Sequence, residues 1–250
     1  MGTITIKNQD ELAAMRKAGR IVAEVFELMY EKIRPGVTTA QLNKAAETLI
    51  NKRHARPLFK GYGGFPAAVC ISVNQEVIHG IPGRRVLQEG DIVSIDVGAQ
   101  LNGFCGDGAR TFAVGRIDPA VQHLLDVTQA CLAAGIELAV AGSRLGDIGS
   151  KVQQIAEDEG YGVVRDYVGH GIGRELHEAP EVPNFGTAGR GIRLMNGMAI
   201  AIEPMINMGT KDVYRLKDGW TVVTKDGLPS AHFENTVAIT PEGPQILTVL

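Results

Sequence analysis

The chain has 250 residues and a formal net charge of −3, with 44% hydrophobic and 21% charged residues. This composition excludes an intrinsically disordered chain. Because there is no basic excess, neither nucleic acid nor an anionic membrane surface is expected as a partner. Glycine supplies 31 of the 250 residues, well above the roughly 7% that is usual, and no collagen-like Gly-X-Y period is present. The glycines are therefore expected to serve particular backbone conformations.

The three cysteines, Cys70, Cys105 and Cys131, are odd in number and lack the C-x-x-C spacing of a metal or redox site. This pattern predicts reduced thiols rather than a disulfide framework or a zinc-thiolate site. The first ten residues lack the apolar core of a signal peptide, and no run of about 18 apolar residues suggests a membrane span. We therefore expect a cytoplasmic protein.

The first part of the chain reads as two helices followed by strands. Apolar residues spaced by three and four predict a helix that starts at the capping box Asn8/Glu11 and stops before Pro35-Gly36. A second helix is expected over 39–53, and a glycine-rich loop over 60–66. Short strands are then predicted over 68–73, 76–79, 91–99 and 104–114.

The same order then recurs. Helices are predicted from Asp118-Pro119 to about 141 and from Ser143 to about 160. They are followed by strands over 162–168, 198–206, 221–224, 233–240 and 245–249. This pattern suggests an α+β fold in which two similar halves, about 8–114 and 118–240, place helices outside a curved sheet. Because no Pro/Ser-rich linker separates the halves, we expect one domain over 1–250, with its site at the seam.

Two acidic residues of the first half stand out. Asp96 lies in the apolar segment 91–98, where an isolated charge would be very costly to bury, and Asp107 follows eleven residues later. A short hairpin around Gly103 would bring the two onto neighbouring strands, where they repel unless a cation lies between them. An ion pair with Arg110 is the simpler alternative.

The second half supplies a complementary set. His170 lies between glycines, which suggests open access to its imidazole, and His177 follows seven residues later. Glu203 precedes Pro204 and is therefore expected to stay extended within its strand. Glu234 is a further charge within a strand pattern. Four acids embedded in strands are more than ordinary ion pairing would explain.

Together, these residues form a donor set of four carboxylates and one imidazole: Asp96, Asp107, His170, Glu203 and Glu234. Such a set suits two divalent cations such as Co, Mn, Fe or Zn, and its four negative charges balance two of them. Paired cations can lower the pKa of a shared water toward neutrality, which makes hydroxide the nucleophile.

These residues, in this order, resemble the type I methionine aminopeptidases, in the minimal form typical of bacteria. These enzymes have the pita-bread fold of the creatinase/prolidase superfamily, a curved antiparallel sheet between pseudo-symmetric halves. The resemblance covers essentially the whole chain. Its most specific segments are Ser94-Ile-Asp-Val-Gly98, Gly169-His-Gly-Ile-Gly173, Ile202-Glu-Pro-Met205 and Phe233-Glu-Asn-Thr236.

The resemblance implies removal of the N-terminal methionine from nascent proteins and peptides. Asp96 would chelate one metal, Asp107 and Glu234 would bridge the pair, and His170 and Glu203 would complete the second metal's ligands. Glu203 would also accept a proton from the attacking water. His79 would contact the scissile amide nitrogen, and His177 would hydrogen-bond the substrate carbonyl or its oxyanion. The substrate's free α-amine would lie near the metal held by Asp96.

The resemblance also implies a pocket for the methionine side chain, formed by Phe59, Tyr62, Phe65, Cys70, Leu176 and Trp220. Phe59 and Leu176 differ from the residues of some relatives. A small mouth would restrict the second substrate residue to Gly, Ala, Ser, Thr, Pro, Val or Cys. A monovalent cation is implied near Asn74 and Ser230.

The expected partners are nascent polypeptide N-termini. Ribosome association would suit that substrate, although no motif indicates it, and the resemblance implies a monomer. Two alternatives share the fold: an Xaa-Pro peptidase, and a non-catalytic peptide-binding protein. The former usually has a large additional N-terminal domain, and the latter has typically lost metal ligands. Of the remaining histidines, His54 and His123 are expected at the surface, and His232 matches no motif.

Overall fold

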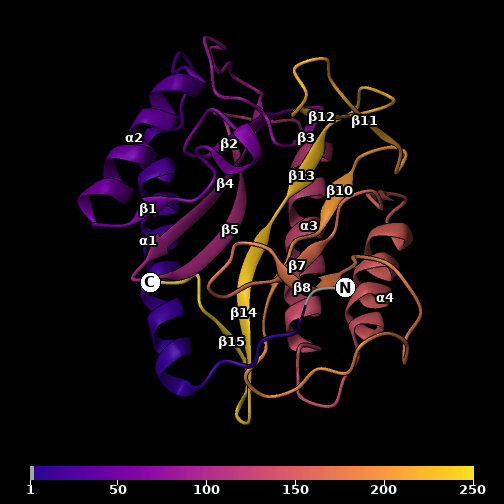
Figure 1. Cartoon of the computed structure of the whole chain (residues 1–250). Coiled ribbons are helices and arrows are strands. Elements are labelled where there is room, and N and C mark those ends of the chain that lie inside the picture. The colour runs from indigo at the N-terminus through magenta and orange to yellow at the C-terminus, as the bar shows by residue number, and fades with distance from the viewer. Residues whose placement is uncertain (1–2) are drawn as a thin grey trace.

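The computed structural model describes residues 3–250, which form four α-helices and fifteen short or long strands. The helices come in two pairs, separated along the chain by the first group of strands. Figure 1 shows one pair on each side of the central strand β14 (Glu234–Thr240). The helices are α1 (Gln9–Lys32), α2 (Thr39–Lys52), α3 (Pro119–Glu137) and α4 (Leu145–Asp158). The predicted α+β class is confirmed.

The helix starts follow from local capping. At α1, Asn8 Oδ1 accepts from the Glu11 backbone N–H at 2.9 Å, and the Glu11 carboxylate accepts from the Asn8 N–H, so the capping box is confirmed. The start predicted at Ser143 is two residues early. There the Asp147 carboxylate accepts from the Arg144 N–H at 2.7 Å, and α4 begins after Arg144.

The main sheet has nine strands among the described residues, and all its paired strands run antiparallel. Its longest ladder is the hairpin of β4 and β5, which turns at Asn102-Gly103 as predicted. The principal path runs β1 (Arg56–Pro57), β4 (Ile92–Leu101), β5 (Phe104–Ala113), β14, β9 (Ala199–Ile202), β7 (Gly169–Gly171) and β8 (Glu178–Val182). Two further strands extend it, with β2 (Cys70–Val73) on β4 and β15 (Gly243–Ile246) on β14. Because β14 joins β5 to β9, it connects the two halves of the sheet.

Two smaller three-stranded sheets complete the described part of the chain. One has the order β13 (Ser230–His232), β10 (Met205–Asn207), β6 (Gly162–Val163). The other has the order β11 (Val213–Arg215), β12 (Val222–Thr224), β3 (Glu76–Ile78).

These sheets correct two sequence predictions. The strand expected over 198–206 is two strands, β9 and β10, which belong to different sheets. Glu203 lies in the break between them rather than inside a strand. Pro204 has no N–H to continue the ladder, so the chain leaves the main sheet there. The strand expected over 162–168 is likewise only Gly162–Val163, with a separate strand at Gly169–Gly171.

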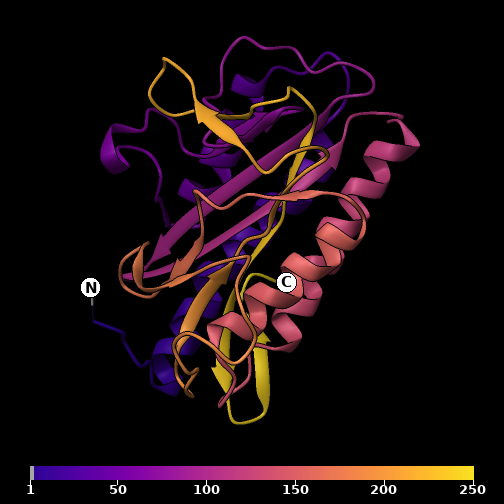
Figure 2. The ribbon, with the colours of Figure 1, turned by 90° about the vertical axis from the view of Figure 1, so that its right-hand side faces the viewer.

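Each helix pair packs on its own part of the sheet and encloses a hydrophobic core. One core joins α1 and α2 to β2 and β4, and the other joins α3 and α4 to β9 and β14. Figure 2 shows the second pair running along one side of the strands. Contact between α1 and β5 is close because Gly106 faces Gly19, where a Cβ on Gly106 would lie 2.6 Å from the Gly19 nitrogen. Residues 106 and 108 thus face the helices, so 107 and 109 face the opposite side.

No helix in residues 3–250 is long and apolar enough to cross a membrane. Cys70, Cys105 and Cys131 are buried and free, as the odd number and spacing predicted.

Candidate metal centre

Strand register brings the acids of β4, β5 and β14 onto one face of the main sheet. Asp96 pairs with Ala109, and Ala109 pairs on its other side with Glu234, so the two acids flank a small residue. Asp107 lies two residues before Ala109 and pairs with Gly98. Residues two apart on a strand share a face, so Asp107 joins the other two. The predicted proximity of Asp96 and Asp107 on neighbouring strands is confirmed.

His170 and Glu203 reach this face from the second half. Gly171 pairs with Ile200, which puts His170 beside Ala201, and Ala201 pairs with Thr236 of β14. The Thr236 hydroxyl accepts from the Asp107 N–H at 3.0 Å and donates to the Asp107 carbonyl at 2.8 Å. Glu203 follows β9 directly, and the Asn184 amide donates to its carbonyl at 2.9 Å. Contacts between distant segments therefore hold both ligand candidates at the seam.

The functional atoms converge. Asp107, His170 and Glu234 each offer a ligand atom, and these atoms lie within 4.8 Å of one another. His170 Nε2 is 3.7 Å from Asp107 Oδ2 and 3.7 Å from Glu203 Oε1. His170 Nδ1 is 2.9 Å from the Gly171 carbonyl, an acceptor, so Nδ1 carries the proton and Nε2 is left free as a ligand.

The electrostatics of the centre favour a cation. Burial, followed by the charges of Asp107 and Glu203, raises the pKa of Asp96 well above its usual value. Burial also raises the pKa of Glu234, and its neighbouring carboxylates add to the effect. Asp96 Oδ1 and Glu234 Oε1 are buried without a hydrogen-bond partner anywhere in residues 3–250. Unpaired buried acceptors beside other carboxylates fit hard or borderline divalent cations, which need oxygen ligands.

The glycines beside His170 do not give the open access to its imidazole that the sequence had predicted. A Cβ on Gly169 would collide with the Ala201 carbonyl, and one on Gly171 with the Ala179 carbonyl. These glycines therefore allow the backbones of neighbouring strands to pack closely. The imidazole is itself buried. Burial lowers the pKa of His170, but Asp107 and Glu203 outweigh that effect, so the pKa is raised.

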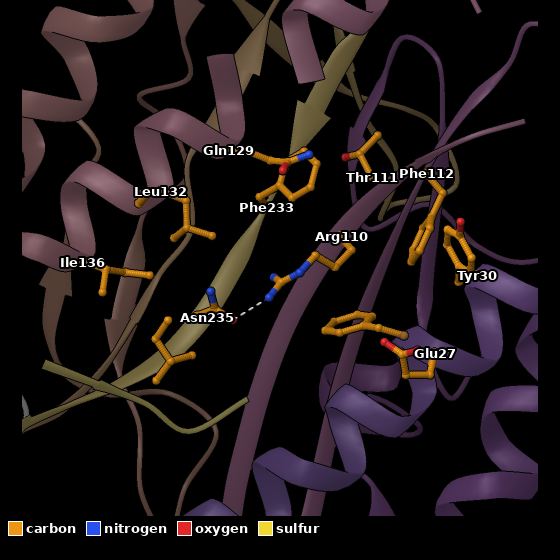
Figure 3. A pocket seen from close by; sticks show the side chains of 13 residues that line it. Glu27, Tyr30, Arg110, Thr111, Phe112, Gln129, Leu132, Ile136, Phe233 and Asn235 are labelled. Atoms are coloured by element: carbon orange, nitrogen blue, oxygen red, sulfur yellow. Dashed lines mark hydrogen bonds between the residues drawn. The ribbon is translucent and has the colours of Figure 1, made fainter. Parts of the chain in front are cut away.

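Arg110 does not pair with either aspartate. It follows Ala109 on β5 and faces the helices, where its guanidinium lies 5.0 Å from the Phe26 ring centroid. Its Nη2 donates to Asn235 Oδ1 at 2.7 Å, and Nη1 donates to the Glu234 main-chain carbonyl. This side chain lines a cavity between α1 and α3 (Figure 3), which has a volume of about 570 Å³. The ion-pair alternative is therefore wrong, because Arg110 and the acids lie on opposite faces of the sheet.

One cavity of about 140 Å³ joins the acids to an apolar wall. Phe65 packs edge-on against Trp220, with ring centroids 5.2 Å apart, and Gly98 leaves room for the Phe59 ring. Burial raises the pKa of Cys70 well above its usual value, so its thiol stays protonated. All residues predicted for the metals, the two histidine roles and the methionine pocket line it: Phe59, Tyr62, Phe65, Cys70, His79, Asp96, Asp107, His170, Leu176, His177, Glu203, Trp220 and Glu234.

The two accessory histidines approach this cavity from different elements. His79, directly after β3, has a φ of 58° and packs edge-on between Tyr167 and Trp220. A non-glycine residue held there costs of order 1–3 kcal/mol, which is a frequent feature of functional sites. Burial lowers the pKa of His79 to about 4 despite the nearby charge of Glu203. Burial, with the charge of His170, also lowers the pKa of His177. Both side chains are therefore neutral near pH 7.

The residues predicted to bind a monovalent cation lie next to each other. Ser230 donates its N–H to the Asn74 carbonyl at 3.0 Å, and its hydroxyl donates to Asn207 Oδ1 at 2.8 Å. The Asn74 amide donates to Asp91 Oδ1, and its Oδ1 accepts from the Ile92 N–H. These bonds join β2, β4 and β13, and a cation there stays a prediction.

Sequence reasoning missed two residues that surround Glu203. Asn184 holds its main chain, as described above, and His232 lies with Nε2 at 3.7 Å from Glu203 Oε2. Nothing local marks Asn184, but His232 is two residues before Glu234 and so shares its side in the strand pattern. The surface positions predicted for His54 and His123 are confirmed.

Three comparisons relate this geometry to known proteins. The profile of metallopeptidase family M24 matches residues 13–241. A methionine aminopeptidase from Clostridium perfringens is 57% identical over 247 residues, covering 99% of both chains. The solved structure of the methionine aminopeptidase from Thermotoga maritima is 46% identical, with a TM-score of 0.98 over 99% of this chain and 100% of that one. A prolidase from Pyrococcus furiosus, at 24% identity and a TM-score of 0.79 over 98% of this chain and 65% of that one, shares the fold. The predicted pita-bread fold is confirmed.

Proposed function

Because this chain belongs to metallopeptidase family M24 and resembles methionine aminopeptidases over its whole length, we propose that it removes the N-terminal methionine from nascent proteins and peptides. One observation carries the proposal: a single cavity is lined by four carboxylates, by the imidazoles of His79, His170 and His177, and by an apolar aromatic wall. The acids supply the chemistry and the pocket supplies the specificity. Residues 1–250 act as one catalytic domain, with the site at the seam of the two halves.

Five residues would hold two divalent cations, of Co, Mn, Fe or Zn: Asp96, Asp107, His170, Glu203 and Glu234. Support comes from the unpartnered oxygens of Asp96 and Glu234 and from the four carboxyl groups gathered within one centre. Bound there, the cations supply an activated water at neutral pH and polarise the scissile carbonyl. Asp96 belongs to the end of the centre that receives the substrate's free α-amine, which limits the enzyme to the first peptide bond.

Three side chains complete the reaction. Glu203 accepts the proton of the attacking water and delivers it to the departing amine. His79 contacts the scissile amide nitrogen, and its lowered pKa keeps it neutral, with one N–H to donate. His177 hydrogen-bonds the substrate carbonyl and the oxyanion that develops from it. Its Nδ1 is 2.6 Å from the Tyr62 hydroxyl. If the phenol donates this hydrogen bond, Nδ1 is the acceptor, so the imidazole proton is on Nε2 and can be donated to the substrate.

The methionine side chain occupies the apolar part of the cavity, against Phe59, Tyr62, Phe65, Cys70, Leu176 and Trp220. This wall and the acids share one cavity of about 140 Å³, which leaves little room around a bound substrate. We therefore expect a preference for Gly, Ala, Ser, Thr, Pro, Val or Cys as the second substrate residue.

The setting follows from the substrate. Nascent chains are made in the cytoplasm, and the three free thiols suit that reducing compartment. We place the protein there as a monomer that meets its substrates at the ribosome. A monovalent cation near Asn74 and Ser230 would stabilise the junction of β2, β4 and β13.

The test compares hydrolysis of Met-Ala-Ser with that of an Xaa-Pro peptide, with and without added Mn²⁺, Co²⁺ or Fe²⁺. We expect metal-dependent release of methionine from Met-Ala-Ser and little cleavage of the Xaa-Pro peptide. Asp96→Asn is the matched control, because it removes a ligand charge while preserving side-chain size. Preferential cleavage of the Xaa-Pro peptide would favour the prolidase alternative. Metal binding without any cleavage would favour a peptide-binding protein.

A further inference from the structure

His232 is a buried imidazole beside the metal centre to which the proposed mechanism gives no role. The residue is 1% exposed, and neither ring nitrogen has a hydrogen-bond partner within residues 3–250. Unpaired buried polar groups are rare in folded proteins, and each calls for a specific explanation.

The main chain of His232 is held on two sides. His232 ends β13, where it pairs with Met205, two residues after Glu203. Its N–H donates to Thr111 Oγ1 at 2.9 Å, and the same hydroxyl donates to the His232 carbonyl at 2.9 Å. Strand pairing on one side and Thr111 of β5 on the other therefore fix the His232 main chain relative to the break that carries Glu203.

Glu203 lies between two imidazoles. Its Oε1 is 3.7 Å from His170 Nε2, inside the donor set, and its Oε2 is 3.7 Å from His232 Nε2, outside it. A contraction of under 1 Å would convert the second contact into a hydrogen bond. His232 is not among the described residues that line the cavity, although its charge acts on His79, which is one of them.

The chemistry of the pair selects one tautomer of His232. A carboxylate only accepts hydrogen bonds, so Nε2 must carry the proton to bind Glu203. Nδ1 is then a bare acceptor, and a buried acceptor without a partner is tolerated better than a buried N–H without one. The opposite tautomer would point a lone pair at the carboxylate and also leave Nδ1–H unpaired.

We propose that His232 is a positioning residue whose Nε2–H holds Oε2 of Glu203, so that Oε1 stays directed toward His170 and the metals. The inference rests on the proposed function, because it assigns His232 a role through the residue that accepts the proton. Histidine is suited to this position because its donor reaches the carboxylate from a rigid ring that the surrounding core immobilises.

The test compares three forms of the protein: wild type, His232→Gln, which keeps an N–H donor, and His232→Leu, which fills similar space without one. The readouts are kcat and KM for Met-Ala-Ser, and the Mn²⁺ dissociation constant by calorimetry. Loss of a residue that orients a metal ligand typically costs about 10–100-fold in activity or metal affinity. We expect that loss in kcat and Mn²⁺ affinity for His232→Leu, with KM changed by less than about twofold. His232→Gln should stay within about threefold of wild type.

A double-mutant cycle identifies the path of the effect. If His232 acts through Glu203, adding His232→Leu to Glu203→Gln should change kcat by less than about twofold. His123→Gln is the matched control, since it alters an exposed histidine on α3 that pairs with Glu159. Wild-type values are expected for this variant.

Several outcomes would overturn the inference. These are wild-type kcat and Mn²⁺ affinity in His232→Leu, equal losses in the Gln and Leu variants, or full additivity in the cycle. If His232→Leu does not fold, as judged by its circular dichroism spectrum, His232→Met replaces it under the same criteria. Should wild type lack aminopeptidase activity, the proposed function fails, but the order of Mn²⁺ affinities still decides the role of His232.

Discussion

The hydroxyl of Tyr62 and Nδ1 of His177 lie 2.6 Å apart, which joins the glycine-rich loop of the first half to the segment after β7 in the second. Tyr62 is 47% exposed and lines the cavity, so this bond lies on the solvent side of the cavity. The His177 ring also packs against His170, with centroids 4.3 Å apart. One hydrogen bond thus connects the pocket loop to the metal centre.

Tyr62→Phe tests that connection. Removing the phenol leaves the His177 tautomer unselected, so less of the enzyme presents Nε2–H to the substrate. A neutral hydrogen bond is worth about 1 kcal/mol, so kcat/KM for Met-Ala-Ser should fall about fivefold. Mn²⁺ affinity, measured by calorimetry, should not change. A variant with unaltered kcat/KM would show that His177 is oriented by other contacts.

Removing the metals should make stability depend on pH. The raised pKa values of Asp96 and Glu234 mean that the metal-free native state holds protons that the unfolded chain releases above its own pKa. This contribution to stability is fully present below the unfolded pKa, near 4, and is lost as pH rises through the higher native values.

Cations replace those protons, so stabilisation by Mn²⁺ should increase with pH. At 100 times the dissociation constant, the cation adds about 2.7 kcal/mol, or roughly 5–10 °C in Tm for a chain of this size. Thermal melts in chelator and in Mn²⁺ at pH 5.5 and 7.5 measure the difference. In Asp96→Asn, the difference in Tm between chelator and Mn²⁺ should depend less on pH. Equal Tm shifts at both pH values in wild type would contradict the charge argument.

Substitution of His79 should separate catalysis from metal binding. His79→Ala removes the proposed donor to the scissile amide, and kcat should fall by about 10²-fold. The kcat of His79→Asn should fall by a similar factor. This variant should nevertheless be at least as stable as His79→Ala, because asparagine tolerates the φ of 58° better than alanine. Elemental analysis should find wild-type metal content in both. Loss of metal from either variant would mean that His79 belongs to the ligand set.

Gly106→Ala should test the close packing of α1 on β5. The added methyl group would meet the Gly19 backbone, which cannot rotate away, so the free energy of unfolding should fall by about 1–3 kcal/mol. Gly135→Ala in α3 is the control. Its new Cβ would lie 3.3–3.4 Å from methyl groups of three side chains, and alanine favours the helix. Urea unfolding measures both, and equal effects would contradict the packing argument.

Local sequence was sufficient where the determinants are neighbours in the chain. The Asn8/Glu11 box predicted the start of α1, and the turn at Gly103 predicted the hairpin that pairs Asp96 with Ala109. The break at Glu203 was missed because the effect of Pro204 depends on which sheet the following residues join. The local effect of proline predicts that the residue before it is extended, but it does not predict that the hydrogen-bonded pairing of the strand ends there.

The sequence pattern by itself identified which side chains carry the chemistry, because burying several acids and an imidazole within strands is energetically unfavourable without a cation. Tertiary structure alone decided which of them meet. Pairing between β5 and β14 joins Asp107 to Thr236. Arg110, three residues after Asp107 on β5, faces the helices instead. It also placed His232 against Glu203. These contacts join residues far apart in sequence, so they arise only when distant strands pair, and no local pattern records that event.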